Sequence, residues 1–179
     1  MLMATDFFIA YLIKLERMNI SKIALLLLFA TPFANAGSEI VELACVRDEN
    51  ELTVVGRNKI VFDQELKNSL YAGVELSFEY QMKLGKELVV IPYRLSFDMF
   101  SRAYVLRTSD GIQRFADVYS AIAAMEEIDF YRAVSRDVAM DKVLLRFYFD
   151  KEKLPFALHW EVLKSPKWRL SSEWRSCDY

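Results

Sequence analysis

The strongest constraint on the fold is a strict alternation of apolar and polar side chains between residues 74 and 98. One face of residues 74–84 is apolar, at Val74, Leu76, Phe78, Tyr80, Met82 and Leu84. After Gly85 and Lys86 the pattern resumes in residues 87–98, at Val89, Ile91, Tyr93, Leu95 and Phe97. A period of two fits a strand with one buried face, and the glycine suits a tight turn. The segment therefore predicts a β-hairpin.

Shorter apolar runs predict further strands over residues 40–47, 52–62, 102–107, 143–150 and 168–176. In the last run, we expect Trp168, Leu170 and Trp174 to point toward the core together. Pro92 lacks a backbone N–H, so its strand is expected to lie at a sheet edge or to be bulged there. Gly56 suggests a bulge or bend in the second strand.

Two segments have helical signals. Residues 63–73 start at Asp63, a suitable N-cap, and end at Gly73, a suitable C-terminal glycine. Residues 115–128 place apolar side chains three and four apart, which is typical of a helix lying on a sheet. A third short helix is expected after Leu154, with Pro155 in its first turn.

Strands and helices do not alternate along the chain, which favours the α+β class with an antiparallel sheet. We predict a single globular domain over residues 37–179. It has about seven mostly antiparallel strands, in a curved sheet or sandwich, with two or three packed helices. The composition, 54% apolar and 14% aromatic over 179 residues, is sufficient for one core.

Residues 18–36 have the layout of a secretory signal peptide. Lys22 precedes an apolar run over residues 23–30, and Ala34-Asn35-Ala36 forms a small-x-small cleavage site. The run is shorter than the roughly 20 residues that span a bilayer. We therefore expect cleavage after Ala36 and a periplasmic or secreted protein without stable membrane insertion.

Residues 1–17 do not fit this layout, because they place a second apolar patch before the signal. The preferred interpretation is that Met18 is the true start and that residues 1–17 lie upstream of it. The alternative is an uncleaved anchor in the inner membrane that begins near Phe7. Charged residues in that stretch would each cost about 2.5–3.5 kcal/mol at the centre of a membrane helix.

Cys45 and Cys177 both remain after cleavage, near the two ends of the mature chain. Disulfides persist in exported proteins, and a bridge closing so long a loop could contribute up to about 4–5 kcal/mol. Two free thiols are the alternative. No CxxC spacing supports redox chemistry, and no partner residues at suitable spacing support a metal site.

No catalytic constellation is recognisable, so we predict that the chain is not an enzyme and uses no cofactor or metal. His159 is the only histidine and lies among apolar residues. Ser101, Ser120 and Ser135 lack the glycines of a nucleophile elbow. Paired carboxylates of a cell-wall hydrolase could come from Glu126, Glu127 and Asp129, but such a pair must face across a cleft.

The charge balance argues against nucleic acid as a partner. After removal of residues 1–36, 20 basic and 23 acidic residues remain, which gives a net charge of −3. The densest basic stretch, residues 151–153, is interrupted by Glu152 and is interpreted as a solvated turn. Apolar inner faces could hold a lipid or small apolar ligand, although large aromatic side chains favour a filled core.

The stretch from Leu154 to Trp174 holds all three tryptophans and resembles the C-terminal signature of a bacterial envelope family, catalogued as domain of unknown function 4390. The matching residues are Leu154-Pro155, Leu158, Trp168, Leu170, Ser172 and Trp174. Further matching residues are Glu65-Leu66, Leu70, Gly73-Val74, Leu76, Phe78, Leu95-Ser96 and Tyr104-Val105. The resemblance covers most of residues 38–176.

The resemblance implies an exported protein with no established activity and supplies no catalytic residues. It also implies a partner in the envelope, such as a membrane-bound sensor histidine kinase. The sequence thus favours a non-enzymatic interaction or sensory accessory module of the cell envelope. A carrier of a small apolar ligand or lipid is the alternative, and a wall hydrolase comes third.

Overall fold

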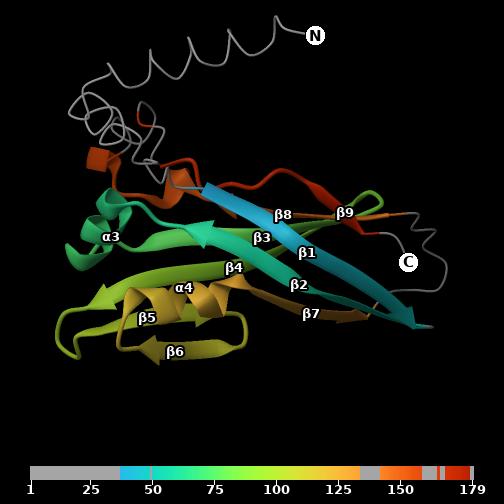
Figure 1. Ribbon diagram of the computed structural model, residues 1–179, viewed down its shortest axis with the longest axis horizontal. Helices are drawn as coiled ribbons and strands as arrows, with labels where there is room; N and C mark the ends of the chain where they lie inside the picture. Colours follow the sequence, from blue (N-terminus) through green and yellow to red (C-terminus); the bar gives the residue numbers. More distant parts are fainter. Residues whose placement is uncertain (1–36, 49, 134–141, 159–164, 166–167, 178–179) are drawn as a thin grey trace, which may run out of the picture. The chain divides into compact units, whose positions relative to one another are not determined.

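The computed structural model (Figure 1) describes residues 37–177 apart from 49, 134–141, 159–164 and 166–167. All of these residues belong to the compact unit Asn35–Tyr179. In the part of the chain described, no helix is long and apolar enough to cross a membrane.

The strands form two antiparallel sheets. The smaller sheet has the order β1-β2-β7, with β1 at Gly37–Asp48, β2 at Glu51–Val61 and β7 at Glu127–Ala133. The larger sheet has the order β6-β5-β4-β3-β8-β9. Its strands are β3 (Leu76–Leu84), β4 (Glu87–Asp98), β5 (Ala103–Thr108), β6 (Gly111–Phe115), β8 (Val143–Phe149) and β9 (Arg175–Cys177).

The described residues also form two α-helices, α3 at Gln64–Tyr71 and α4 at Val118–Glu126. Helix α3 packs against β4, and α4 packs against β2, β5, β6 and β7, as Figure 1 shows. The α+β class with antiparallel strands is therefore confirmed. The described residues form nine strands in two sheets, however, rather than about seven.

The two extra strands escaped prediction for different reasons. Strand β6 is exposed over nearly its whole length, so it has no alternating apolar face. Strand β7 follows α4 without an intervening turn, and Ile128 continues the apolar spacing of the helix. The predicted helix over residues 115–128 was therefore too long at both ends. Asp117 is the N-cap, and its side chain accepts a hydrogen bond from the N–H of Ser120.

The predicted hairpin is confirmed as β3 and β4, which pair from Leu76↔Leu95 to Leu84↔Glu87. Gly85 in the turn has a φ of 59°, in the left-handed region that suits glycine. The predicted ends of α3 are also confirmed. Asp63 caps its N-terminus and Gly73, with a φ of 89°, follows its C-terminus.

The two irregular positions have clear structural counterparts. The β1–β2 register shifts between Ile40 and Glu42, so the extra residue lies in β1, close to Gly56, rather than in the second strand where the bulge was expected. A Cβ at Gly56 would lie 2.2 Å from the carbonyl oxygen of Glu42, so only glycine permits this approach. Pro92 is in a strand between two others, but β5 pairs only with residues 94–98 of β4. Pro92 therefore lies in a stretch where β4 has an open side.

The core lies between the sheets and is filled largely by aromatic rings. Phe78 packs against Phe147 and Phe149 at centroid distances of 5.4 and 5.1 Å, and Phe149 stacks on Trp168 at 6.0 Å. The indole N–H of Trp168 donates to Glu65 of α3 at 3.0 Å. The last part of the chain is thus tied to the first helix.

The C-terminal segment differs from its prediction in three respects. Only Arg175–Cys177 forms a strand, because Ser171 and Ser172 bond with backbone groups of β8 through their side chains. Trp168 and Leu170 are buried, as predicted, but Trp174 packs on the opposite side of the sheet. The short helix expected after Leu154 is a single 3₁₀ turn, η2 at Phe156–Leu158, and another 3₁₀ turn, η1 at Lys151–Lys153, precedes Leu154.

Candidate functional site

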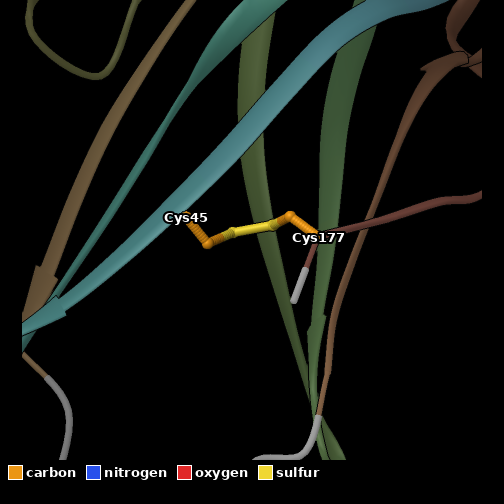
Figure 2. Close-up of a disulfide and its surroundings, with 2 residues drawn as sticks. All are labelled: Cys45 and Cys177. Atoms are coloured by element: carbon orange, nitrogen blue, oxygen red, sulfur yellow. A yellow bond between two sulfur atoms is a disulfide. The ribbon is translucent and has the colours of Figure 1, made fainter. Parts of the chain in front are cut away.

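The structure joins Cys45 of β1 to Cys177 of β9 in a disulfide, the pairing predicted from the sequence (Figure 2). The two Cα atoms are 5.8 Å apart, within the usual range for such a bridge. The bond joins β1, an edge strand of the small sheet, to β9, an edge strand of the large sheet. Arg175 adds a second link, since its guanidinium donates to the carbonyl oxygen of Ile40 at 2.8 Å.

The residues considered for catalysis do not come together. His159 and Ser135 lie outside the described residues. Ser101 donates to Asp98 in the β4–β5 turn, and Ser120 donates to Asp117 at the N-terminus of α4. Within the described ranges, no group of His, Cys, Asp and Glu side chains could hold a metal ion.

The acidic residues at the end of α4 also have structural surroundings. Glu126 accepts a hydrogen bond from the backbone N–H of Ile60 at 2.7 Å, which fastens α4 to β2. Glu127 and Asp129 line a broad depression of about 710 Å³ on the small sheet, together with Glu42 and Arg57. Because Glu126 is used in the fold, it is not available as one member of a catalytic pair.

A buried polar network crosses the core. The amide of Asn58 accepts from Ser38 at 2.9 Å and donates to the Tyr80 hydroxyl at 3.1 Å. Tyr80 in turn donates to the carbonyl oxygen of Met125 at 2.8 Å. Burial raises the pKa of Tyr80 far above its ordinary value. The network therefore stays neutral and holds β1, β2, β3 and α4 together.

The most distinctive exposed feature is an aromatic cleft where α3 ends and the β4–β5 turn begins. Tyr71 stacks on Phe97 at a centroid distance of 4.8 Å, and Phe97 lies 4.9 Å from Tyr104. The cleft has a volume of about 460 Å³ and is lined by Tyr71, Phe97, Met99, Arg102, Tyr104 and Ala116. We call these six residues the aromatic cleft.

The turn beside the cleft presents two apolar side chains to solvent. Phe100 is fully exposed and Met99 is 68% exposed. Asp98 makes the turn rigid, because its carboxylate accepts from the N–H groups of Phe100 and Ser101 and from the Ser101 hydroxyl. These bonds also lower the pKa of Asp98, the Ser101 hydroxyl having the largest effect.

Arg102 closes this turn with a φ of 51°, the only positive value among the described non-glycine residues. This left-handed backbone costs about 1–2 kcal/mol for a residue with a Cβ, and glycine or asparagine would adopt it more readily. Strained positions are common where a side chain is held for binding. Arg102 is one of the residues that line the cleft.

The aromatic cleft is rich in hydrogen-bond donors. Its lining residues include Arg102, Tyr71 and Tyr104, whose side chains carry N–H and O–H donors, and no Asp or Glu is among them. Partial burial, followed by the charges of Tyr71 and Asp117, raises the pKa of Tyr104 above its ordinary value. An apolar group that carries a carboxylate fits this chemistry.

Sequence reasoning missed the aromatic cleft, although one signal was present. Met99 and Phe100 are adjacent apolar residues in a turn between two predicted strands. Turns are normally polar, and consecutive exposed apolar residues usually have a function. The contribution of Tyr71 could not be found from the sequence, because α3 meets β4 only through the tertiary fold.

A family model matches residues 35–178 of the chain, and the family is described as a domain of unknown function (DUF4390). The match confirms the resemblance that the sequence motifs indicated. No curated protein and no solved structure gives a significant match.

Proposed function

The chain belongs to this family of unknown function, and from that premise we propose that it is an exported, non-enzymatic interaction module that docks onto a protein of the cell envelope. The observation that carries the proposal is the aromatic cleft with its rigid apolar turn. Exposed apolar side chains on a preformed turn lose little entropy on binding, as interface anchors require.

Export is supported by two independent features. The sequence over residues 18–36 has the layout of a cleavable signal, and Cys45 is bonded to Cys177. Disulfides are stable in oxidising compartments such as the periplasm and are rare in the cytosol. Cleavage after Ala36 would leave a mature protein that starts at Gly37, the first residue of β1.

The cleft also indicates what a partner must offer. A segment with an apolar or aromatic side chain next to an acidic residue would place its ring against Phe97 and its carboxylate near Arg102. Met99 and Phe100 would enter a complementary pocket on the partner. The partner class proposed is a membrane protein with a domain facing the periplasm, such as a sensor histidine kinase.

Photo-crosslinking in living cells tests this proposal. A photoreactive phenylalanine analogue replaces Met99 in one strain and Lys59, an exposed residue of β2 in the small sheet, in a control strain. We expect the first strain alone to yield a defined crosslinked product, identified by mass spectrometry as an envelope membrane protein. Arg102→Gln should weaken this crosslink strongly.

The proposal fails if Met99 and Lys59 give the same products, or if Arg102→Gln leaves the crosslink unchanged. Each variant also requires a stability check. Because Met99 and Lys59 are exposed, their replacement should change the free energy of unfolding by less than about 0.5 kcal/mol. If a variant changes the free energy of unfolding by more than this, a lost crosslink in that variant is due to misfolding.

A further inference from the structure

Each strand from β6 to β8 in the large sheet contributes one cationic side chain to the same face. Strand alternation and the pairing register place them on the side opposite the core, and they are Arg114, Arg107, Arg94, Lys83 and Arg146. We call this side of the large sheet the outer face. The same strands place only Glu79 and Asp98 there as carboxylates.

Four of these five cations form no ion pair among the described residues, although the charge of Arg114 helps to lower the pKa of Asp98. The fifth, Arg107, pairs with Glu75 at 3.2 Å. Glu79 is occupied by Lys153 at 3.2 Å and by the Gln81 amide, and Asp98 is used by its own turn. The outer face is therefore locally positive on a chain whose formal net charge is −2.

Two of these cations lie directly opposite each other on neighbouring strands. Arg94 of β4 and Arg107 of β5 are direct cross-strand partners. Like charges in directly opposite positions destabilise a sheet. Arg114 lies diagonally from Arg107 across the β5–β6 pairing, which adds a third positive charge to this cluster.

A second cluster surrounds Trp174. The Lys83 ammonium and the Arg146 guanidinium each lie 4.5 Å from the centroid of its indole ring. Two hydrogen bonds from Arg146 to the Gln81 side chain, at 2.9 and 2.7 Å, fix the guanidinium. The indole thus holds two cations close together in an ordered arrangement.

Apolar side chains lie between the cations. Leu88 is the cross-strand partner of Lys83, and Val90 is the partner of Gln81. Leu88 is 50% exposed, Val90 43% and Ile112 of β6 59%. The outer face therefore combines positive charge with accessible hydrocarbon.

The positive charge is also spread widely. Arg94 pairs with Ser77 at one end of β3, and Lys83 is six residues further along, so the two clusters are separated by roughly 20 Å along the strand. A single small anion cannot bridge that distance. An extended anionic surface can contact both clusters at once.

We propose that the outer face binds an anionic membrane surface as a peripheral contact. Cationic side chains are attracted by anionic headgroups, and tryptophan with neighbouring aliphatic side chains is favoured at the lipid–water boundary. The exposed Leu88 and Val90 favour a lipid surface over a soluble polyanion, which offers no hydrocarbon. This proposal does not depend on the aromatic cleft, since none of the five cations of the outer face lines the cleft.

Vesicle co-sedimentation tests the proposal, with the protein purified as cells produce it. We expect binding to vesicles that contain phosphatidylglycerol and none to vesicles of phosphatidylcholine alone. Each Lys or Arg side chain that lies near the anionic membrane surface increases the partition coefficient about fivefold. Replacing both Lys83→Gln and Arg146→Gln should therefore weaken binding about 25-fold. The matched control, Arg57→Gln with Lys59→Gln, removes the same charge from exposed positions of β2 and should change binding less than about twofold.

A second pair of variants separates a membrane from a soluble polyanion. Leu88→Asn with Val90→Asn should weaken vesicle binding while leaving binding to dextran sulfate unchanged. If this variant binds vesicles as well as the wild type does, a polyanion site replaces the membrane and the proposal is overturned. It is also overturned if the Arg57 and Lys59 control loses as much binding as the Lys83 and Arg146 variant, because bulk charge would then account for the attraction.

Discussion

On the inner face of the large sheet, Phe78, Tyr80 and Phe147 are buried ring against ring, with centroids 5.0–5.4 Å apart. Their sequence neighbours on the outer face include Glu79, Gln81 and Arg146, which are polar and linked by side-chain hydrogen bonds. The same strands thus carry two unrelated kinds of surface. The difference shows that alternate positions of one strand can serve stability and recognition separately.

Tryptophan gives the sharpest form of this comparison. Trp168 is fully buried in the core, whereas Trp174 packs under the cations of the outer face. Trp168→Ala should lower the free energy of unfolding by about 3–5 kcal/mol, because it leaves a large cavity. Trp174→Ala is the control and should cost no more than about 1 kcal/mol. Urea unfolding of both variants measures the contrast, and equal losses would contradict the separation of the two faces.

The disulfide is the next largest expected contribution, because it holds the inner side of β9 against β1. Cys45→Ser combined with Cys177→Ser should lower stability by about 2–4 kcal/mol. The change is read from the urea midpoint and slope, with reduced wild-type protein as the reference. If the double variant were as stable as the oxidised wild type, the bridge would contribute nothing to holding the sheets together.

A pH titration separates the faces through Tyr93, an inner-face residue. Burial, followed by the charge of Asp110, raises the pKa of Tyr93 to about 12 from its ordinary value of 10.0. The folded state favours the protonated hydroxyl, so the raised pKa contributes to the free energy of unfolding. This stabilisation is complete below pH 10 and is lost as the pH rises toward 12. Raising the pH from about 9 to about 11.5 should lower the free energy of unfolding of both proteins. The decrease should be roughly 1 kcal/mol smaller for Tyr93→Phe than for the wild type. Identical pH profiles would place Tyr93 in contact with water.

The smallest expected effect concerns Arg94 on the outer face. Arg94→Gln removes the repulsion from Arg107 and should raise stability by about 0.2–1 kcal/mol. The same change should weaken binding to phosphatidylglycerol vesicles about fivefold. Lys59→Gln serves as the control for a lost positive charge. A variant that lost both stability and binding would mean that Arg94 supports the fold rather than the proposed membrane contact.

Much of the fold could be predicted because its signals are local. The β3–β4 hairpin follows from alternation and the ends of α3 from Asp63 and Gly73, while the irregularity expected at Gly56 lies in the facing strand β1. Strands β6 and β7 could not be predicted in the same way. One has no buried face, and the other continues the apolar spacing of α4 without a break.

Neither candidate surface could be predicted as a whole. The aromatic cleft needs Tyr71 from α3 beside Phe97 from β4, which are far apart in the sequence. The five cations of the outer face come from five different strands, so they form no basic run in the sequence. The negative net charge of the chain also gives no sign of a positive surface.

By itself the sequence determined the class of fold, the family and the pair of cysteines, because alternation, motif spacing and composition are properties of the chain. Only the tertiary structure decided the division into two sheets, the opposite placement of Trp168 and Trp174, and the gathering of Lys83 with Arg146. These depend on which strands pair and in which register, since a shift of one residue would turn every side chain to the other face.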